Sequence, residues 1–541
     1  MCSCAKRSAI VSVVLGMLAL GLSGCNIPRL RHMDSTPIIP EDFRGRTSAE
    51  NSAQIGIAEF FNDPVLTGLL TYGLAQNQEL RIRNEEVQIA NNEILARRGA
   101  YLPFLNIGLN GGMDRNSRYM PLGAAEDQLT WPNGGNFPDP MARMGLGSNL
   151  FWQVDIWRQL RNARDAAYLR YVAAYEARNY LITKLVSETA DNYYELSALD
   201  QRLVYLNQTI DLQQKSLEVA RLQKAAARGT ELGVQRFLAE VRKNESQRQI
   251  INQRIIEVEN RINFLVGRYP QPVARELWDF INLNSRVLQV GVPVELLGNR
   301  RDIRAAEQEV AACGLDILVA RKNFYPKLIL TGRVGYEAFN PKFLFDPASF
   351  AAAAAGELVA PLMNKKAIQA EYMNANARQL QAIYNYQRTI LNAFTEVVNL
   401  MAKVENYRES VLVKQEQVRA MEASVTAATD LFQNVHLDVN REPEVKYIDV
   451  LFAQRDLLEA RTVLIETKQQ QFSAIVNAYR ALGGGYLLGT GEEFDDLFFM
   501  PPVLQFEEME APAAPAEATL PAPNALQQTS PDAPKAPGEE S

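Results

Sequence analysis

The chain repeats one plan twice, and this duplication constrains its fold more than any single residue does. A helix-like segment leads into an alternating stretch marked by a proline, a second alternating stretch follows, and a long heptad hairpin closes the unit. The plan runs from Phe61 to Pro270 and again from Arg301 to Gly485. Duplication of this kind indicates a repeated architecture. Each unit combines a membrane-barrel pattern with a coiled-coil pattern.

The first residues predict export from the cytoplasm. A basic pair precedes an apolar run, which is typical of a signal peptide, here 1–24. The run ends in a motif that resembles the bacterial lipobox, which implies that Cys25 becomes the lipidated mature N-terminus. An ordinary signal peptide with an incidental cysteine is the alternative. Asn26 is not the aspartate that often retains lipoproteins at the inner membrane, so we expect the outer membrane. These features comprise Lys6 and Arg7, the run 9–22, and Leu22, Ser23, Gly24 and Cys25.

Composition excludes several classes of protein. Without the signal peptide only Cys25 and Cys313 remain, and Cys25 carries the lipid, so no disulfide is expected within the chain. Cys313 lies among apolar residues and is expected to be a small buried side chain. The net charge of −7 becomes −9 once the basic pair is removed, which argues against nucleic acid as a partner. No later apolar run approaches the roughly 18 residues of a spanning helix.

Four segments alternate between apolar and polar residues, two in each repeat. They predict strands at about 103–113, 143–154, 326–338 and 348–360. Without a spanning helix, a route through the bilayer has to be a closed β-barrel. For any single strand, the alternative is a soluble β-hairpin with one solvent-exposed face. Because a membrane barrel needs about eight strands, the chain is expected to oligomerise. The residues expected to face the lumen are Asn106, Asn149, Thr331, Arg333 and Glu337.

Long heptad patterns predict one helical hairpin in each repeat, at about 160–266 and 366–482. In the second hairpin, apolar positions step by four and three from Leu400 to Phe432 with one polar member. An ordinary helical core is the alternative. At about 1.5 Å per residue, such helices reach tens of ångströms beyond a membrane.

The remaining segments connect or end these units. We expect a lipid-anchored linker at 25–58, the first repeat at 59–270, a linker between repeats at 271–300, and the second repeat at 301–485. The segment 486–541 follows. From about 507 it is dominated by Pro, Ala, Glu and Ser, which predicts disorder because such a composition buries too little apolar surface.

Short motifs along both repeats resemble the outer-membrane efflux proteins of the TolC and OprM type, in their lipoprotein (NodT-type) form. Each motif is weak alone, but their order and spacing extend over nearly the whole chain from Phe61 to Gly485. The motifs comprise Asn62, Asp63, Pro64, Leu66, Asn77 and Leu80; Trp152, Asp155, Ile156 and Arg161; 301–307; Tyr325 and Pro326; Asp449, Val450 and Leu451; and 481–485.

The resemblance implies an α+β membrane protein. Three protomers with four strands each would form a twelve-stranded outer-membrane β-barrel, continued into a long periplasmic α-helical barrel. It implies a passive exit duct of a tripartite efflux or type I secretion-like system, docked to a periplasmic adaptor and an inner-membrane transporter. A coiled-coil lipoprotein tether that conducts nothing is the alternative, but a tether has no use for a polar lumen.

No enzyme activity, cofactor or metal is expected. The sequence offers no constellation of nucleophile, base and metal ligands, and its two histidines, His32 and His436, lie far from any cluster of possible ligands. The expected partners are two further copies of the chain in a homotrimer, the periplasmic adaptor, the inner-membrane transporter and outer-membrane lipids.

The resemblance places a gate at the tips of the hairpins. Asp449 matches the first acidic position of a ring that narrows the closed tunnel in the family. The position three residues later, often a second aspartate, is Phe452 here, which predicts an apolar constriction beside the ring. Solvated surface residues are the alternative for these positions. Further gate candidates are Asp438, Glu442 and Glu444, and the expected adaptor-docking residues are Arg228, Gly229, Leu232, Gly233 and Tyr447.

Overall fold

A computed structural model describes residues 27–131, 134–227, 229–275, 280–283, 288–361, 365–434, 447–489 and 492–493. The chain divides into one unit from Met1 to Phe494 and a second from Asp495 to Ser541. The second unit lies outside the described residues, as do the predicted signal peptide and the predicted disordered tail.

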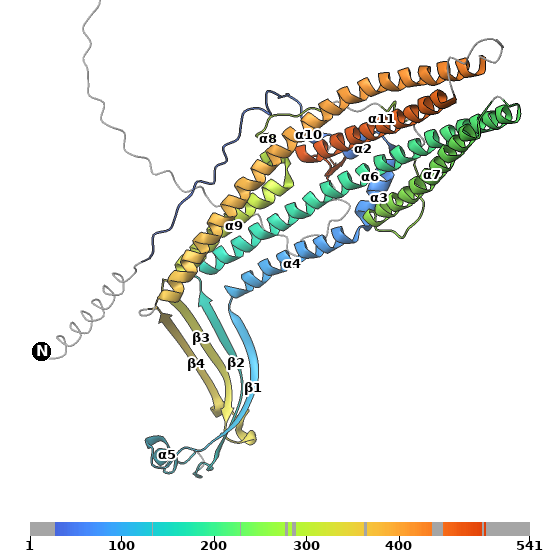
Figure 1. Ribbon diagram of the computed structural model, residues 1–541. Helices are drawn as coiled ribbons and strands as arrows, with labels where there is room; N and C mark the ends of the chain where they lie inside the picture. Colours follow the sequence, from blue (N-terminus) through green and yellow to red (C-terminus); the bar gives the residue numbers. More distant parts are fainter. Residues whose placement is uncertain are drawn as a thin grey trace, which may run out of the picture. The chain divides into compact units, whose positions relative to one another are not determined.

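Helices and strands follow one another in the same order in the two halves of the first unit (Figure 1). The principal helices are α2 (Ile57–Phe61), α3 (Pro64–Gln76), α4 (Gln78–Ala100), α5 (Pro121–Glu126), α6 (Gln159–Ala225), α7 (Glu231–Leu265), α8 (Glu295–Asn299), α9 (Arg301–Lys322), α10 (Lys366–Asn434) and α11 (Tyr447–Leu482). The strands are β1 (Phe104–Asp114), β2 (Met141–Val154), β3 (Lys327–Ala338), β4 (Phe350–Val359), β5 (Leu487–Gly489) and β6 (Glu492–Glu493). Short 3-10 turns are η1 (Ser52–Gln54), η2 (Pro341–Phe343) and η3 (Pro347–Ser349).

The first four strands form one antiparallel sheet in the order β1-β2-β3-β4. Their ends lie within two residues of the predicted ranges; β2, for example, begins at Met141 rather than at 143. Proline precedes β1 at Pro103 and β3 at Pro326, where an extended backbone is favoured. Within the part of the chain that the structure describes, β1 and β4 each pair on one side only, so both carry an open edge.

The helices attached to these strands lie side by side in the order of the strands. α4 contacts α6, α6 contacts α9, and α9 contacts α10. α7 returns along α6, and α11 returns along α10 (Figure 1). Apolar residues at heptad spacing fill the two hairpin seams, as the periodicity predicts. They include Leu206, Ile210, Ile251 and Val258 in the first, and Val411, Val418, Leu457 and Leu464 in the second.

Several residues of the sequence motifs cap helices. Asp63 Oδ1 accepts hydrogen bonds from two backbone N–H groups at the start of α3, both at 2.9 Å. Asn77 separates α3 from α4: its Oδ1 accepts from Leu80 N at 2.8 Å and its Nδ2 donates to Leu265 O at 2.7 Å. At the end of α11, Gly483 has φ +103°, and a Cβ there would lie 2.7 Å from the backbone of Asn299. These contacts fix where one helix ends and the next begins.

The segment before α2 runs along α10. Ile27 packs against the apolar cluster that contains Tyr372 near the start of that helix. Arg31 exchanges two backbone hydrogen bonds with the Asn376 side chain, at 3.1 and 2.9 Å. Farther along, the Phe43 ring stacks on Phe394 with centroids 5.4 Å apart. One side of α10 is therefore covered by this segment.

Candidate functional site

The sheet brings the predicted lumen-facing residues onto one face. In the register of the strands, Asn106 lies opposite Asn149, and Asn149 lies opposite Arg333. Thr331 and Glu337 share that face, because side chains alternate along β3 with a period of two. The five residues come from three strands, and pairing alone places them together.

Polar contacts connect this face. Arg333 and Glu337 form an ion pair along β3. Gly145, opposite Glu337, leaves room for its neighbours: a Cβ there would lie 2.5 Å from Asn110 Oδ1 and 3.5 Å from Arg333 Nη2. Both ionised side chains are exposed, so the pair keeps its charges in water and adds little stability.

The opposite face is apolar and ends in aromatic side chains. Near the β3–β4 turn, the Tyr336 ring packs against Phe350 with centroids 5.9 Å apart. At the helical end, Trp157 stacks on Tyr325 at 5.2 Å and donates its Nε1–H to Pro326 O at 2.7 Å. At about 3.3 Å per residue, Tyr325 and Tyr336 lie about 36 Å apart along an extended strand. That length crosses an apolar band about 25 Å tall at strand tilts of about 40°.

The first hairpin tip is a capped turn. Thr230 ends the turn, and its Oγ1 accepts a hydrogen bond from the buried Gly233 N at 3.3 Å. A Cβ on Gly229 would lie 3.1 Å from the backbone of α6, so the turn is tight there. Leu232 is 58% exposed, an apolar side chain presented at the tip. Arg228 lies outside the described residues.

The second hairpin tip is described on one side only. α10 ends at Asn434 and α11 begins at Tyr447, so the predicted gate residues between them, Asp438, Glu442 and Glu444, lie outside the described residues. Asp449 is exposed in the first turn of α11, and Phe452, one turn on, is 43% exposed.

Arg455 adds a cation that sequence reasoning missed at this tip. Its guanidinium carbon lies 4.9 Å from the centroid of the Phe452 ring. The spacing of three residues between Phe452 and Arg455, on one helical face, was the signal that could have found it. The exposed face thus carries a carboxylate, an aromatic ring and a guanidinium in succession.

The two hairpins meet through apolar and polar side chains: Phe472 of α11 stacks on Tyr194 of α6 with ring centroids 4.8 Å apart. Between α6 and α11, Arg202 pairs with Glu466 at 3.1 Å, and Gln454 Nε2 donates to Ser216 Oγ at 3.3 Å. Since exposed ion pairs and neutral hydrogen bonds each contribute about 1 kcal/mol or less, these polar pairs add to the apolar packing rather than replace it.

Two titratable groups are buried at the same contact. Burial raises the pKa of Asp191, and hydrogen bonds from Ser473 and Asn477 offset part of that rise. Burial lowers the pKa of Lys468, whose ammonium lies 5.2 Å from the centroid of the Phe472 ring. Both groups are harder to charge here than in water.

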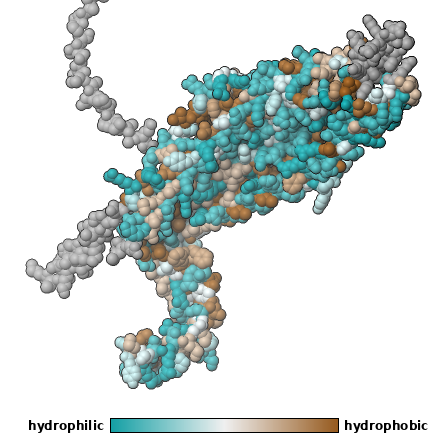
Figure 2. Space-filling view, viewed as in Figure 1, coloured by the Kyte–Doolittle hydropathy of each residue, from teal (hydrophilic) through white to brown (hydrophobic). Residues whose placement is uncertain are grey.

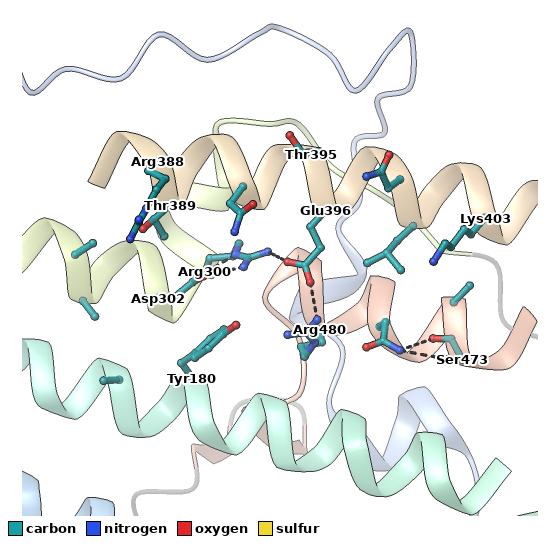
Figure 3. A pocket seen from close by; sticks show the side chains of 18 of the residues that line it. Tyr180, Arg300, Asp302, Arg388, Thr389, Thr395, Glu396, Lys403, Ser473 and Arg480 are labelled. Carbon is teal, nitrogen blue, oxygen red and sulfur yellow. Dashed lines mark hydrogen bonds and ion pairs between the residues drawn. The ribbon is translucent and has the colours of Figure 1, made fainter. Parts of the chain in front are cut away.

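Sequence reasoning also missed a polar groove of about 1130 Å³ between the long helices. α10 forms one side and α6 the other, and α9 and α11 meet between them (Figure 3). At its centre Arg300 Nη1 lies 2.8 Å from Glu396 Oε2, and Arg480 Nη2 lies 2.5 Å from Glu396 Oε1. These residues are at least 84 positions apart in sequence, so no local motif predicts the cluster.

Within the described residues, no group of three or more His, Cys, Asp or Glu side chains converges as a metal site would require. Cys313 is buried, and burial raises the pKa of its thiol to about 11. None of the described helices has a stretch long and apolar enough to cross a bilayer. The helices present a mostly hydrophilic surface with separate apolar patches in Figure 2.

Comparison with known proteins agrees with this arrangement. The family model described as "Outer membrane efflux protein" matches residues 69–260 and 292–484. The solvent efflux pump outer membrane protein SrpC of Pseudomonas putida is 26% identical over 86% of this chain and 97% of its own length. The cation efflux system protein CusC of Escherichia coli is 25% identical over 87% and 97%. The open MtrE outer membrane channel of Neisseria gonorrhoeae superposes with a TM-score of 0.73 at 21% identity, covering 86% of this chain and 99% of that one.

The family model covers most of the chain, one match in each repeat. The solved channels share the fold, so the predicted fold class, barrel strands continued into long helical hairpins, is confirmed. The predictions of an efflux duct and of the outer membrane as its location are confirmed by the same matches. The chain belongs to the outer membrane efflux protein family.

Proposed function

We propose that three copies of this chain close one twelve-stranded barrel and act as a passive exit duct. The observation that carries the proposal is the pair of open edges: β1 and β4 have no second partner among the strands of the described residues. Unpaired strand edges are too costly in lipid to remain open. Pairing β1 of one copy with β4 of the next satisfies both edges at once.

The two faces of the sheet support the same assembly. The polar face, with Asn149 and Arg333, would line a water-filled lumen, while Leu105, Ile107 and Leu109 on the other face of β1 would contact lipid. All three leucine and isoleucine side chains are well exposed in the isolated chain, between 64% and 77%. An exposed apolar row on a strand is expected where lipid replaces water.

We also propose that Cys25 carries the lipid. Ile27 packs beside Phe324, where α9 ends and β3 is about to begin, at the helical end of the sheet. Two residues of chain span at most about 7 Å, so a lipid on Cys25 would be attached within that reach of Ile27. Intact mass of the mature protein tests this: an unmodified Cys25 would contradict it.

We propose that the hairpin tips dock a periplasmic adaptor joined to an inner-membrane transporter, with Gly229, Leu232 and Gly233 at the first tip and Arg228 and Tyr447 as further contacts. The exposed Leu232 offers the apolar contact such docking needs. Cysteine cross-linking from position 232 tests the docking, and an adaptor that is never captured in cells would contradict it.

A gate beside these tips would use Asp449 and Phe452, with the acidic residues Asp438, Glu442 and Glu444 around it. Its supporting observation is the exposed carboxylate and ring at the start of α11. The chain has no catalytic role in this proposal, and its relatives are efflux channel proteins. One of these relatives is named for solvent efflux and the other for cation efflux. Because similar ducts serve such different cargo, the proposal assigns cargo selection to the transporter.

Single-channel recording of the purified protein in a planar bilayer tests the duct. The expected result is a wide pore that stays mostly closed. Insertion without conduction would favour a tether instead, and a protein that never inserts would contradict the barrel. The mass of the oligomer in detergent gives the number of copies, which the proposal expects to be three.

A further inference from the structure

The polar groove between α6 and α10 has a surplus of positive charge. Its lining carries four cations and three carboxylates. Asp302 pairs with Arg300 at 2.7 Å, and Glu396 pairs with Arg300 and Arg480. Glu309 lies 3.5 Å from Arg170, which also pairs with Asp316. Arg300 is only 5% exposed, so its pairs are shielded from salt. The central network is therefore a fixed, closed set of charges.

Two cations of the groove have no carboxylate partner among the described residues. They are Arg388, whose guanidinium donates to the neighbouring Asn385 Oδ1 at 2.6 Å, and Lys403. Figure 3 shows them at opposite ends of the groove. Fifteen residues of helix separate them, about 22 Å at 1.5 Å per residue. Both side chains are exposed and available to a solute.

Neutral hydrogen-bonding groups connect the two cations along α10. Asn392 and Asn399 line the groove, and neither amide makes a hydrogen bond among the described residues. Each offers two N–H donors. The groove thus presents hydrogen-bond donors between two positive charges, which favours an anion over a cation.

The covered side of the helices indicates which way the groove opens. Phe394 of α10 stacks on Phe43, and Tyr479 of α11 stacks on Phe60 with centroids 3.8 Å apart, so N-terminal residues cover that side. The N-terminal segment continues from Cys25, whose lipid would lie outside the barrel. The groove residues Asn392 and Asn477 lie on other faces of these helices. They face the tunnel in the assembly proposed above.

We propose that this groove binds organic anions bearing carboxylate groups as they pass through the tunnel, three grooves to each trimer. A carboxylate would meet Lys403 first on its way from the hairpin tips and Arg388 nearer the membrane, with the amides between them holding it in transit. The tunnel-facing position rests on the proposed duct, whereas the affinity for an anion rests on the groove itself.

Two dyes with one ring system and opposite charge test the proposal on the full-length protein in detergent. Fluorescence anisotropy should show binding of anionic carboxyfluorescein, weakening as salt is raised, and no comparable binding of cationic rhodamine 6G. The double variant Arg388→Ala/Lys403→Ala should weaken carboxyfluorescein binding at least tenfold, and Arg388→Lys should retain it. The matched control Lys215→Ala/Arg419→Ala removes two exposed cations outside the groove and should stay within twofold of wild type.

A double variant that keeps its oligomer and helical content and still binds carboxyfluorescein like wild type would overturn the proposal. So would a wild-type protein that prefers the cationic dye. Binding is measured without a membrane, so its failure in a protein that conducts would count against the groove alone. A protein that binds the dye but never conducts would count against the duct.

Discussion

The guanidinium of Arg461 lies 4.6 Å from the centroid of the Tyr205 ring and donates a hydrogen bond to Glu422 at 2.6 Å. One side chain of α11 thus contacts its own hairpin partner α10 and the opposite hairpin at α6. The hydrogen bond to Glu422 lies within one hairpin, whereas the contact with Tyr205 joins the two hairpins. Arg461 is therefore placed to hold the hairpins together without fixing either one.

Replacing Tyr205 by leucine keeps most of the apolar area and removes the cation–π contact. Such contacts are worth about 0.5 to 2 kcal/mol, so Tyr205→Leu should raise the ratio of open to closed channels about 2- to 30-fold in bilayer recordings. Tyr269→Leu is the control, because Tyr269 is 92% exposed. If both variants had the same open probability as wild type, the contact between Arg461 and Tyr205 would not stabilise the closed channel.

The start of α11 should control how ions enter. Asp449→Ala removes an exposed carboxylate and should reduce the preference for cations, seen as a shift of the reversal potential in a salt gradient. Phe452→Ala should raise conductance by removing an apolar ring. Glu416→Ala, an exposed carboxylate on α10, is the matched control. The gate lies elsewhere if neither change at α11 exceeds the effect of the control.

Glycine at one row of the sheet is required by close strand contact. A Cβ on Gly335 would lie 2.4 Å from Leu146 O, whereas a Cβ on Gly108, in the same row, meets nothing within 4 Å. Gly335→Ala should therefore force β2 and β3 apart and lower the fraction of oligomer measured in detergent, and Gly108→Ala should leave that fraction unchanged. Equal behaviour of the two variants would contradict this reading of the sheet.

The α6–α11 contact should depend on pH through Asp191. Its folded-state pKa is raised above the unfolded value of 3.8, because burial disfavours the carboxylate. The folded state then holds the proton more tightly, so this group's contribution to stability is full below pH 3.8 and is lost as pH rises through the raised pKa. Glu195 adds to the rise, and Arg480 opposes it.

Asp191→Asn should remove that part of the pH dependence. Thermal melts followed by circular dichroism from pH 4 upward should show the melting temperature of wild type falling relative to the variant, with the variant at least as stable near neutral pH. Parallel curves for the two proteins would show that the Asp191 carboxyl does not titrate as described.

The sequence predicts the strands closely because two physical signals coincide there. Alternation fixes the two faces of β1 and β3, and Pro103 and Pro326 mark where they begin. Even the alanine-rich β4, whose own alternation is weak, is positioned by pairing with β3. The predicted lumen-facing residues share one face because of this register, since three strands at fixed pairing bring their polar side chains together.

The groove could not be predicted in the same way. Arg300 and Glu396 are 96 residues apart, and Arg480 follows 84 residues later. Heptad periodicity identifies seams within each hairpin but not which helices of different hairpins become neighbours, so it leaves Arg461 and Tyr205 unconnected. Turn residues located the first tip, whereas the second tip lies mostly outside the described residues.

Closure of the barrel between copies is the central claim, and cysteine cross-linking across the open edges tests it most directly. In a Cys313→Ser background, one cysteine at Ile107 on β1 would be combined in turn with one at Phe350, Ala352 or Ala354 on β4, positions on the same face. Oxidation in outer membranes should give covalent dimers and trimers for at least one pair, and nothing larger. Monomers alone from every pair, or a ladder that continues beyond three, would contradict the closed trimeric duct.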